Sequence, residues 1–173
     1  MTFRDFPRFD ETTAPAPARE ALAKSKRAFG AIPTPLARYA SSPLLLQTAL
    51  SGLESFDHSS LAPLEREVLA MTMGRRNGCK FCLDLHRRLL SAQHAPASLI
   101  EQLESGEPLS DSRLEALRGF VVALLETNGD VSPSVWARFR EAGYTHQHAL
   151  DVVAGVGVYT MTTLANRLTE TSE

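Results

Sequence analysis

Two cysteines and a histidine stand close together in the chain, at Cys79, Cys82 and His86. Their spacing of i, i+3 and i+7 places all three within about 60° of arc on one face of an α-helix, at roughly 100° per residue. Neighbours three residues apart are close enough for the two sulfurs to join in a disulfide after small adjustments. The chain has no other cysteine. In a reducing compartment, such a pair indicates redox chemistry or metal binding rather than a structural disulfide.

Two physical effects favour different cysteines as the reactive thiol. His86 follows Cys82 by one helical turn, so its imidazole is near enough to take the proton of the Cys82 thiol, directly or through one water. Cys79 lies nearer the start of the expected helix, where unpaired backbone N–H groups lower the pKa of a thiol. The spacing alone therefore leaves the identity of the nucleophile open.

A helix-turn-helix must hold these side chains. One helix is expected to open at Pro63 and to end at Asn77-Gly78, because Asn and Gly tolerate the positive φ of a helix C-terminus. The next helix then runs from the first cysteine to about Gln93. A tight turn between the two helices would fold Glu67 back over the start of the second one. There Glu67 could orient His86 or relay a proton.

Helix start and stop signals recur along the chain, whereas the alternating apolar and polar runs typical of half-buried strands are missing. The other expected helices are 16–29, one opening at Ser42-Pro43, 96–105, 111–127, 133–143 and 145–168. The segment 32–35 is expected only to bend the chain. The sequence thus predicts an all-α protein, with an N-terminal arm over 1–15 and a single helical domain over 16–173.

Composition and charge exclude several classes of protein. The 173 residues are 43% hydrophobic and 22% charged, which is ordinary for one soluble globular domain. A net charge of −2 provides no positive electrostatic potential that would attract nucleic acid. Neither a signal peptide nor an apolar stretch long enough to span a membrane is evident, so a cytoplasmic location without membrane contact is expected. No Gly-rich phosphate loop or nucleotide fingerprint is present, so no organic cofactor is expected.

The order of the candidate site residues resembles the carboxymuconolactone decarboxylase superfamily, in particular its AhpD-like alkylhydroperoxidase branch. The signature of that branch is a Glu, eleven residues, a Cys, two residues, a Cys, three residues and a His. Glu67, Cys79, Cys82 and His86 match every spacing. The segments 32–33, 40–43, 61–67 and 142–144 also look like those of peroxidase-related members of the family.

This resemblance implies an AhpD-like helical domain, with the CxxC pair at the start of a central helix, that assembles into a homo-oligomer. It implies hydroperoxide reduction in which Cys82 is the peroxidatic thiol and Cys79 the resolving thiol, with Glu67 and His86 as the proton relay. The implied partners are a hydroperoxide substrate and an external dithiol reductant, lipoyl or thioredoxin-like. Some AhpD-like enzymes carry a second His directly before the second Cys, where this chain has Phe81. A proton relay with one histidine fewer is therefore expected. Members that lack the cysteine pair perform lactone decarboxylation, and the intact pair argues against that activity.

Other interpretations use the same four residues. The cysteines could be inert core residues, or the group could serve a non-enzymatic redox sensor or bind zinc. Structural zinc sites usually draw a second ligand pair from a separate segment, and the chain has no further cysteine, so no metal is expected.

The final expected helix carries more apolar residues than one monomer core can cover, which predicts self-association. These residues are Val152, Val153, Val156, Val158, Tyr159 and Met161.

Overall fold

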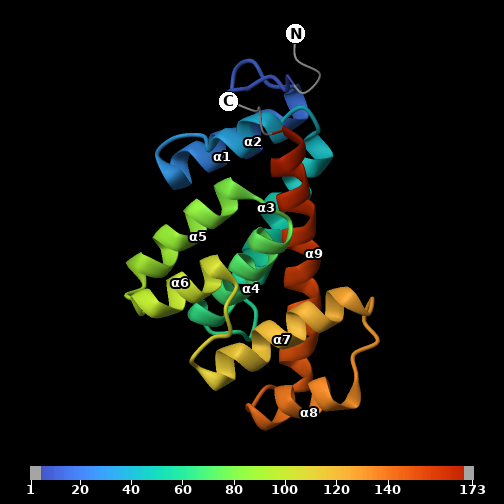
Figure 1. The fold of residues 1–173 in the computed structure, drawn as a ribbon. Helices are drawn as coiled ribbons and strands as arrows, with labels where there is room; N and C mark the ends of the chain where they lie inside the picture. Colours follow the sequence, from blue (N-terminus) through green and yellow to red (C-terminus); the bar gives the residue numbers. More distant parts are fainter. Residues whose placement is uncertain (1–4, 170–173) are drawn as a thin grey trace. The chain divides into compact units, whose positions relative to one another are not determined.

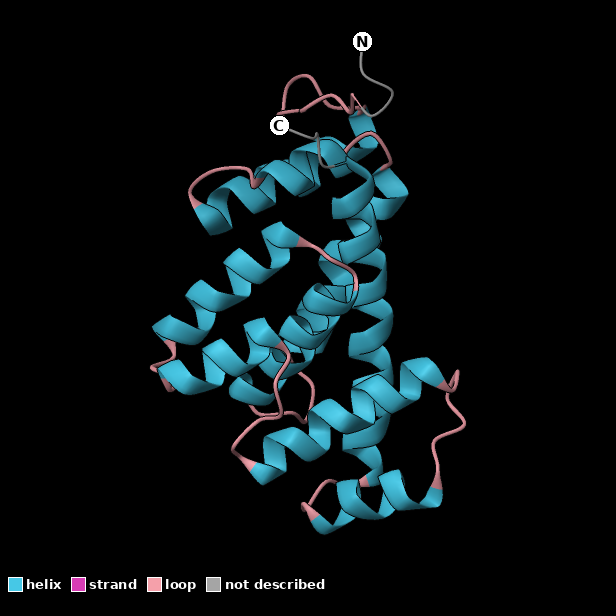
Figure 2. Ribbon diagram, viewed as in Figure 1, coloured by secondary structure: helices cyan, strands magenta, loops and turns pink. Residues whose placement is uncertain are grey.

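The structure is a computed structural model that describes residues 5–169. These residues form helices joined by turns and loops, with no strand among them (Figure 1, Figure 2). In chain order, the helices are α1 (Ala16–Phe29), α2 (Thr34–Tyr39), α3 (Pro43–Asp57), α4 (Pro63–Arg76), α5 (Lys80–Ala92), α6 (Ala97–Ser105), α7 (Ser112–Glu126), α8 (Pro133–Glu141) and α9 (His146–Thr169). The prediction of an all-α fold is confirmed.

Most helix boundaries lie within one or two residues of those expected, because the signals that set them are local. The helix α2 is the exception, since the segment 32–35, which includes its first two residues, was expected only to bend the chain. Pro33 is the N-cap of α2, and Pro35 lies in its first turn, where the missing N–H of proline has no helical partner to lose. The same prolines that indicate a bend therefore also start a short helix.

Backbone contacts divide the chain into two compact units. Of the described residues, one unit contains 5–55 and 164–169, and the other contains Phe56–Thr163. The helices α3 and α9 contribute residues to both units. The division between an arm over 1–15 and one domain over 16–173 stays a prediction. All four candidate site residues belong to the second unit.

Within the first unit, α2 provides contacts to segments that are distant in sequence. The N–H of Phe9 donates to the carbonyl of Ala37 at 3.1 Å, which ties the segment before α1 to α2. The hydroxyl of Tyr39 donates to Oδ1 of Asn166, near the end of α9.

Within the second unit, α4 packs against α5, α6 and α7, and α7 packs in turn against α8 (Figure 1). Every residue of α4 from Val68 to Gly74 is buried, so this helix is enclosed on nearly all sides. In contrast, α5 buries only Cys82, His86 and Leu90. The helix that carries the second cysteine and the histidine thus turns one narrow face inward.

Among residues 5–169, none of the helices combines the length and the apolar character needed to cross a membrane.

Candidate redox site

The turn between α4 and α5 places the first cysteine. Gly78 adopts a positive φ of 63°, as expected for the end of α4, and the N–H of Cys79 donates to the carbonyl of Gly74 at 2.9 Å. Cys79 has an extended backbone and is the N-cap of α5, so it precedes the helix instead of forming part of it. Its Sγ accepts a hydrogen bond from the N–H of Cys82 at 3.3 Å. The sulfur of Cys79 therefore meets the positive end of the helix dipole.

Cys79 and Cys82 are joined in a disulfide, with their Cα atoms 5.3 Å apart. The two residues keep only 1% and 5% of their surface exposed. The pair thus has the proximity that the i, i+3 spacing predicts, and it lies in an almost closed environment.

Gly74 allows α4 and α5 to approach closely at this point. A Cβ atom on Gly74 would lie 3.3 Å from Cβ of Cys82 and 3.5 Å from Cδ2 of Leu83. The first of these distances is tighter than ordinary carbon contacts. Because Gly74 has no side chain, Cys82 of the disulfide can lie directly against the backbone of α4.

Glu67 and His86 meet across the helix-turn-helix. Nδ1 of His86 lies 2.8 Å from Oε2 of Glu67, and both side chains are largely buried. An ionised carboxylate can only accept hydrogen bonds, so Nδ1 carries a proton. In the neutral ring, Nε2 is then the basic nitrogen. The structure brings together all four residues singled out in the sequence, and their catalytic roles stay a prediction.

The tyrosine at position 159 is a member of this group that the sequence did not identify. Its ring packs edge-to-face with the ring of His86, with centroids 5.4 Å apart, and in the same manner with the ring of Phe56 at 5.8 Å. Burial raises the pKa of Tyr159 above its usual range, and the negative charge of Glu67 adds to the effect. The sequence marked Tyr159 only as an apolar residue of the last helix, and no local spacing connects it to His86.

A second buried carboxylate on α4 has a structural role. Oε1 of Glu65 accepts a hydrogen bond from Nε of Arg113 at 3.0 Å and lies 2.9 Å from Nη2 of the same guanidinium in an ion pair. The other oxygen of Glu65 accepts from the N–H of Ala62 at 2.8 Å. The guanidinium of Arg113 also lies 4.2 Å from the ring centre of Tyr144. This network anchors the first turn of α4.

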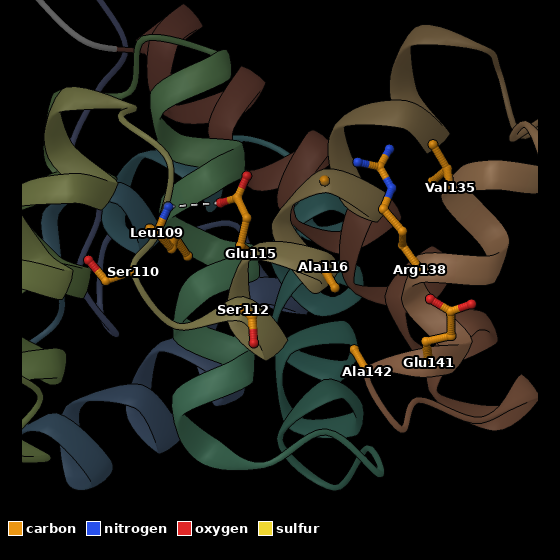
Figure 3. A pocket seen from close by; sticks show the side chains of 10 residues that line it. Leu109, Ser110, Ser112, Glu115, Ala116, Val135, Arg138, Glu141 and Ala142 are labelled. Carbon is orange, nitrogen blue, oxygen red and sulfur yellow. Dashed lines mark hydrogen bonds between the residues drawn. The ribbon is translucent and has the colours of Figure 1, made fainter.

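A pocket of about 540 Å³ lies between α7, α8 and the segment before α7 (Figure 3). Its lining includes Glu115, whose carboxylate accepts hydrogen bonds from Arg118 at 2.7 and 2.6 Å and from the N–H of Leu109 at 2.9 Å. Burial opposes ionisation of Glu115, but these hydrogen bonds outweigh it and lower its pKa. No cysteine or histidine lines the pocket. The pocket is therefore separate from the redox group, by which we mean Glu67, Cys79, Cys82, His86 and Tyr159.

Within residues 5–169, no three or more His, Cys, Asp or Glu side chains gather in a way that could hold a metal ion.

Comparison with known proteins identifies similar folds. No family model and no curated protein sequence matches the chain. A crystal structure described as an alkylhydroperoxidase AhpD core, an uncharacterized peroxidase-related protein from Ralstonia eutropha JMP134, matches with a TM-score of 0.78 and 19% identity over 94% of this chain and 86% of that one. An uncharacterized peroxidase-related protein from Silicibacter sp. TM1040 matches with a TM-score of 0.74 and 22% identity over 92% and 84% of the two chains.

A protein of unknown function from Agrobacterium tumefaciens, named for the antioxidant defence protein AhpD, matches with a TM-score of 0.62 and 17% identity over 75% of this chain and 88% of that one. The chain therefore has the AhpD-like, carboxymuconolactone decarboxylase-type fold. This confirms the fold expected from the resemblance.

Proposed function

We propose that this protein is a thiol-dependent hydroperoxide reductase. The observation that carries the proposal is the buried Cys79–Cys82 disulfide at the start of a helix whose His86 is paired with Glu67. Such a group contains a redox-active sulfur pair and a base held by a carboxylate. The names of the structural neighbours, peroxidase-related and AhpD, support the same class of chemistry.

The reaction begins with the reduced protein. His86 takes the proton of the Cys82 thiol, and the thiolate attacks the terminal oxygen of a hydroperoxide. The S–O bond forms as the O–O bond breaks, and the departing alkoxide receives the proton from His86 to become an alcohol. Cys82 is now a sulfenic acid. The Cys79 thiol condenses with it, releasing water and forming the disulfide.

The cap position of Cys79 suits its role in the second half of the cycle. When an external dithiol attacks the Cys82 sulfur, Cys79 leaves as a thiolate. The N-terminus of α5 stabilises negative charge on this sulfur, which already accepts the Cys82 N–H. A lower pKa makes a thiol a better leaving group.

The external reductant must reach a disulfide that is almost enclosed. A dithiol carried on a slender arm, as in a lipoyl group, fits this environment better than a thiol on a broad protein surface. We therefore propose a lipoyl-type reductant over a thioredoxin-type one. Continuous turnover by a dithiol requires a reducing compartment, which is consistent with action in the cytoplasm.

We also propose that the protein forms a homo-oligomer. Leu150 and Val153 of α9 are 70% and 48% exposed, and Ala154 and Gly157 on the same helix face are exposed too. Their spacing of i, i+3, i+4 and i+7 makes one continuous apolar face, which a second copy of the chain would cover.

A thiol titration tests the main proposal. The protein is reduced, freed of reductant and given one equivalent of cumene hydroperoxide, and its free thiols are then counted. We expect both thiols to disappear, with one equivalent of alcohol formed. Two remaining thiols would overturn the proposal. Catalytic consumption of hydroperoxide with dihydrolipoamide distinguishes an enzyme from a sensor that reacts only once.

A further inference from the structure

Two polar atoms in the redox group have no hydrogen-bond partner among residues 5–169. One is Nε2 of His86, because the hydrogen bond of this ring uses Nδ1. The other is the hydroxyl of Tyr159, because the side chains of Thr162 and Thr163 donate to the backbone carbonyl of Tyr159 and not to its hydroxyl. The two residues keep just 7% and 9% of their surface exposed. Neither atom is completely closed off from solvent, since neither is among the fully buried polar atoms that lack a partner. An acceptor and a donor that lack a protein partner, in two largely buried residues and still accessible, indicate a place for a small polar ligand.

The side chains that carry the two atoms lie against each other in the second unit. The rings of His86 and Tyr159 are in edge-to-face contact, and Cys82 lies one helical turn before His86 on the buried face of α5. A ligand that reaches the sulfur of Cys82 therefore comes within reach of both groups. A hydroperoxide is complementary to them, because its oxygens can accept hydrogen bonds both from the Tyr159 hydroxyl and from Nε2 of His86 once Nε2 has taken the proton of the Cys82 thiol.

We propose that the Tyr159 hydroxyl donates a hydrogen bond to the inner oxygen of the hydroperoxide, the one bonded to carbon, and is a further catalytic residue. This inference rests on the proposed function and names a group that acts on the substrate. When the Cys82 thiolate attacks the outer oxygen and the O–O bond breaks, negative charge develops on the inner oxygen. The hydrogen bond from Tyr159 stabilises that charge, and the proton held by His86 completes the alcohol, so Tyr159 ends the step unchanged.

The surroundings of Tyr159 suit a donor. The raised pKa keeps the hydroxyl protonated throughout the range in which a thiol reacts. The ring is held between Phe56 and His86, so the hydroxyl has a fixed position before the substrate arrives. A donor held in place in a site of low dielectric stabilises a developing oxyanion more than a mobile one does.

The substitution Tyr159→Phe tests the hydroxyl alone, because the ring and its two edge-to-face contacts remain. The second-order rate constant for oxidation of the reduced protein by cumene hydroperoxide is expected to fall about tenfold to a hundredfold, the range for losing one hydrogen bond to a negatively charged oxygen. Alkylation of the reduced thiols by iodoacetamide measures Cys82 without a peroxide. We expect that rate to stay within about twofold of the wild type, since the hydroxyl acts on the departing oxygen and not on the thiol.

Tyr144→Phe is the matched control. Tyr144 is also buried, burial also raises its pKa, and its ring also packs edge-to-face on a histidine, with 5.6 Å between its centroid and that of His148. This variant should react with both reagents at the wild-type rate. Thermal melting of the two variants checks that each is folded.

Each outcome has a distinct meaning. Equal peroxide rates for the wild type and Tyr159→Phe would overturn the inference while leaving the proposed function intact. Equal slowing with peroxide and with iodoacetamide would also overturn it, because the hydroxyl would then act through the thiol. A wild-type protein that does not react with hydroperoxide would overturn the proposed function, and this inference with it.

Discussion

Nδ1 of His86 in α5 and Oε2 of Glu67 in α4 lie 2.8 Å apart. The contact links the two helices on either side of the turn at Gly78, where the chain reverses its direction. The pair fixes the orientation of the imidazole and leaves Nε2 as the basic atom of the neutral ring. A carboxylate in this position also stabilises the imidazolium that forms when the ring takes a proton. We therefore propose a positioning role for Glu67 and a proton-transfer role for His86.

The first prediction follows from this division of roles. His86→Ala should slow the reaction of the reduced protein with hydroperoxide by about 10²-fold, the low end for loss of a general base. Glu67→Ala should slow it in the same direction and by less, because the imidazole remains but is no longer held. Rates at several pH values by stopped-flow measure both. A larger loss in Glu67→Ala than in His86→Ala would contradict the assignment.

The second prediction concerns the close approach of α4 to the disulfide. Gly74→Ala gains helix propensity of about 1 kcal/mol but forces a Cβ atom to within 3.3 Å of Cβ of Cys82, and such overpacking costs about 1–3 kcal/mol. We expect a net loss of roughly 1 kcal/mol in the free energy of unfolding, measured by urea denaturation. The control is Gly119→Ala in α7, where a Cβ atom meets nothing within 4 Å. That variant should be more stable by up to about 1 kcal/mol, and equal stabilisation of both would show that Gly74 has no packing role.

The parts of the site that the sequence predicted are those encoded over short distances. Asn77-Gly78 ends α4 and reverses the chain, and that reversal brings Glu67 to His86. The place of Cys79 as an N-cap outside the helix depends on one residue's backbone, which spacing does not resolve.

Pairings between distant segments escaped prediction. Tyr159 reaches His86 from the last helix, and Arg113 reaches Glu65 from α7. No periodicity within either helix indicates which distant side chain it will meet. The phenol of Tyr159 follows the same helical pattern as an apolar core residue, so its hydroxyl could be recognised only once its neighbours were known.

The third prediction tests self-association through α9. Sedimentation at micromolar concentration should give a mass above the 18.9 kDa of one chain. Leu150→Lys places a charge in the exposed face and should shift the mass toward that of the monomer, because burying an unpaired charge is costly. Leu44→Lys serves as the control, since Leu44 is similarly exposed but belongs to α3. A wild-type mass of 18.9 kDa would exclude the homo-oligomer.

The fourth prediction concerns alkaline pH. Burial raises the pKa of Tyr39, Tyr144 and Tyr159 from the ordinary value of 10.0, and these are all the tyrosines of the chain. The folded state therefore holds these protons at a pH where the unfolded state has released them. Their contribution to stability is complete below about pH 10 and is lost as pH rises toward the folded-state pKa values. Phenolate absorbance should appear near pH 10 in denaturant and only at higher pH in the folded protein. Coincident titration curves would contradict the burial of these hydroxyls.

The last prediction separates the two thiols. His86 lies one helical turn from Cys82, whereas Cys79 is the N-cap, whose sulfur accepts the Cys82 N–H. We therefore expect the base to assist Cys82 and the helix terminus to stabilise a thiolate on Cys79 as a leaving group.

Cys79→Ser should consequently react once with hydroperoxide and stop at a sulfenic acid on Cys82, which dimedone traps for mass spectrometry. Cys82→Ser should fail to react at a comparable rate, because its remaining thiol is beyond the reach of the base. Both variants need a melting curve that shows intact folding. If Cys82→Ser consumes hydroperoxide at the wild-type rate while Cys79→Ser does not, then stabilisation of the thiolate at the helix terminus outweighs assistance by the base, and the roles of the two cysteines must be exchanged.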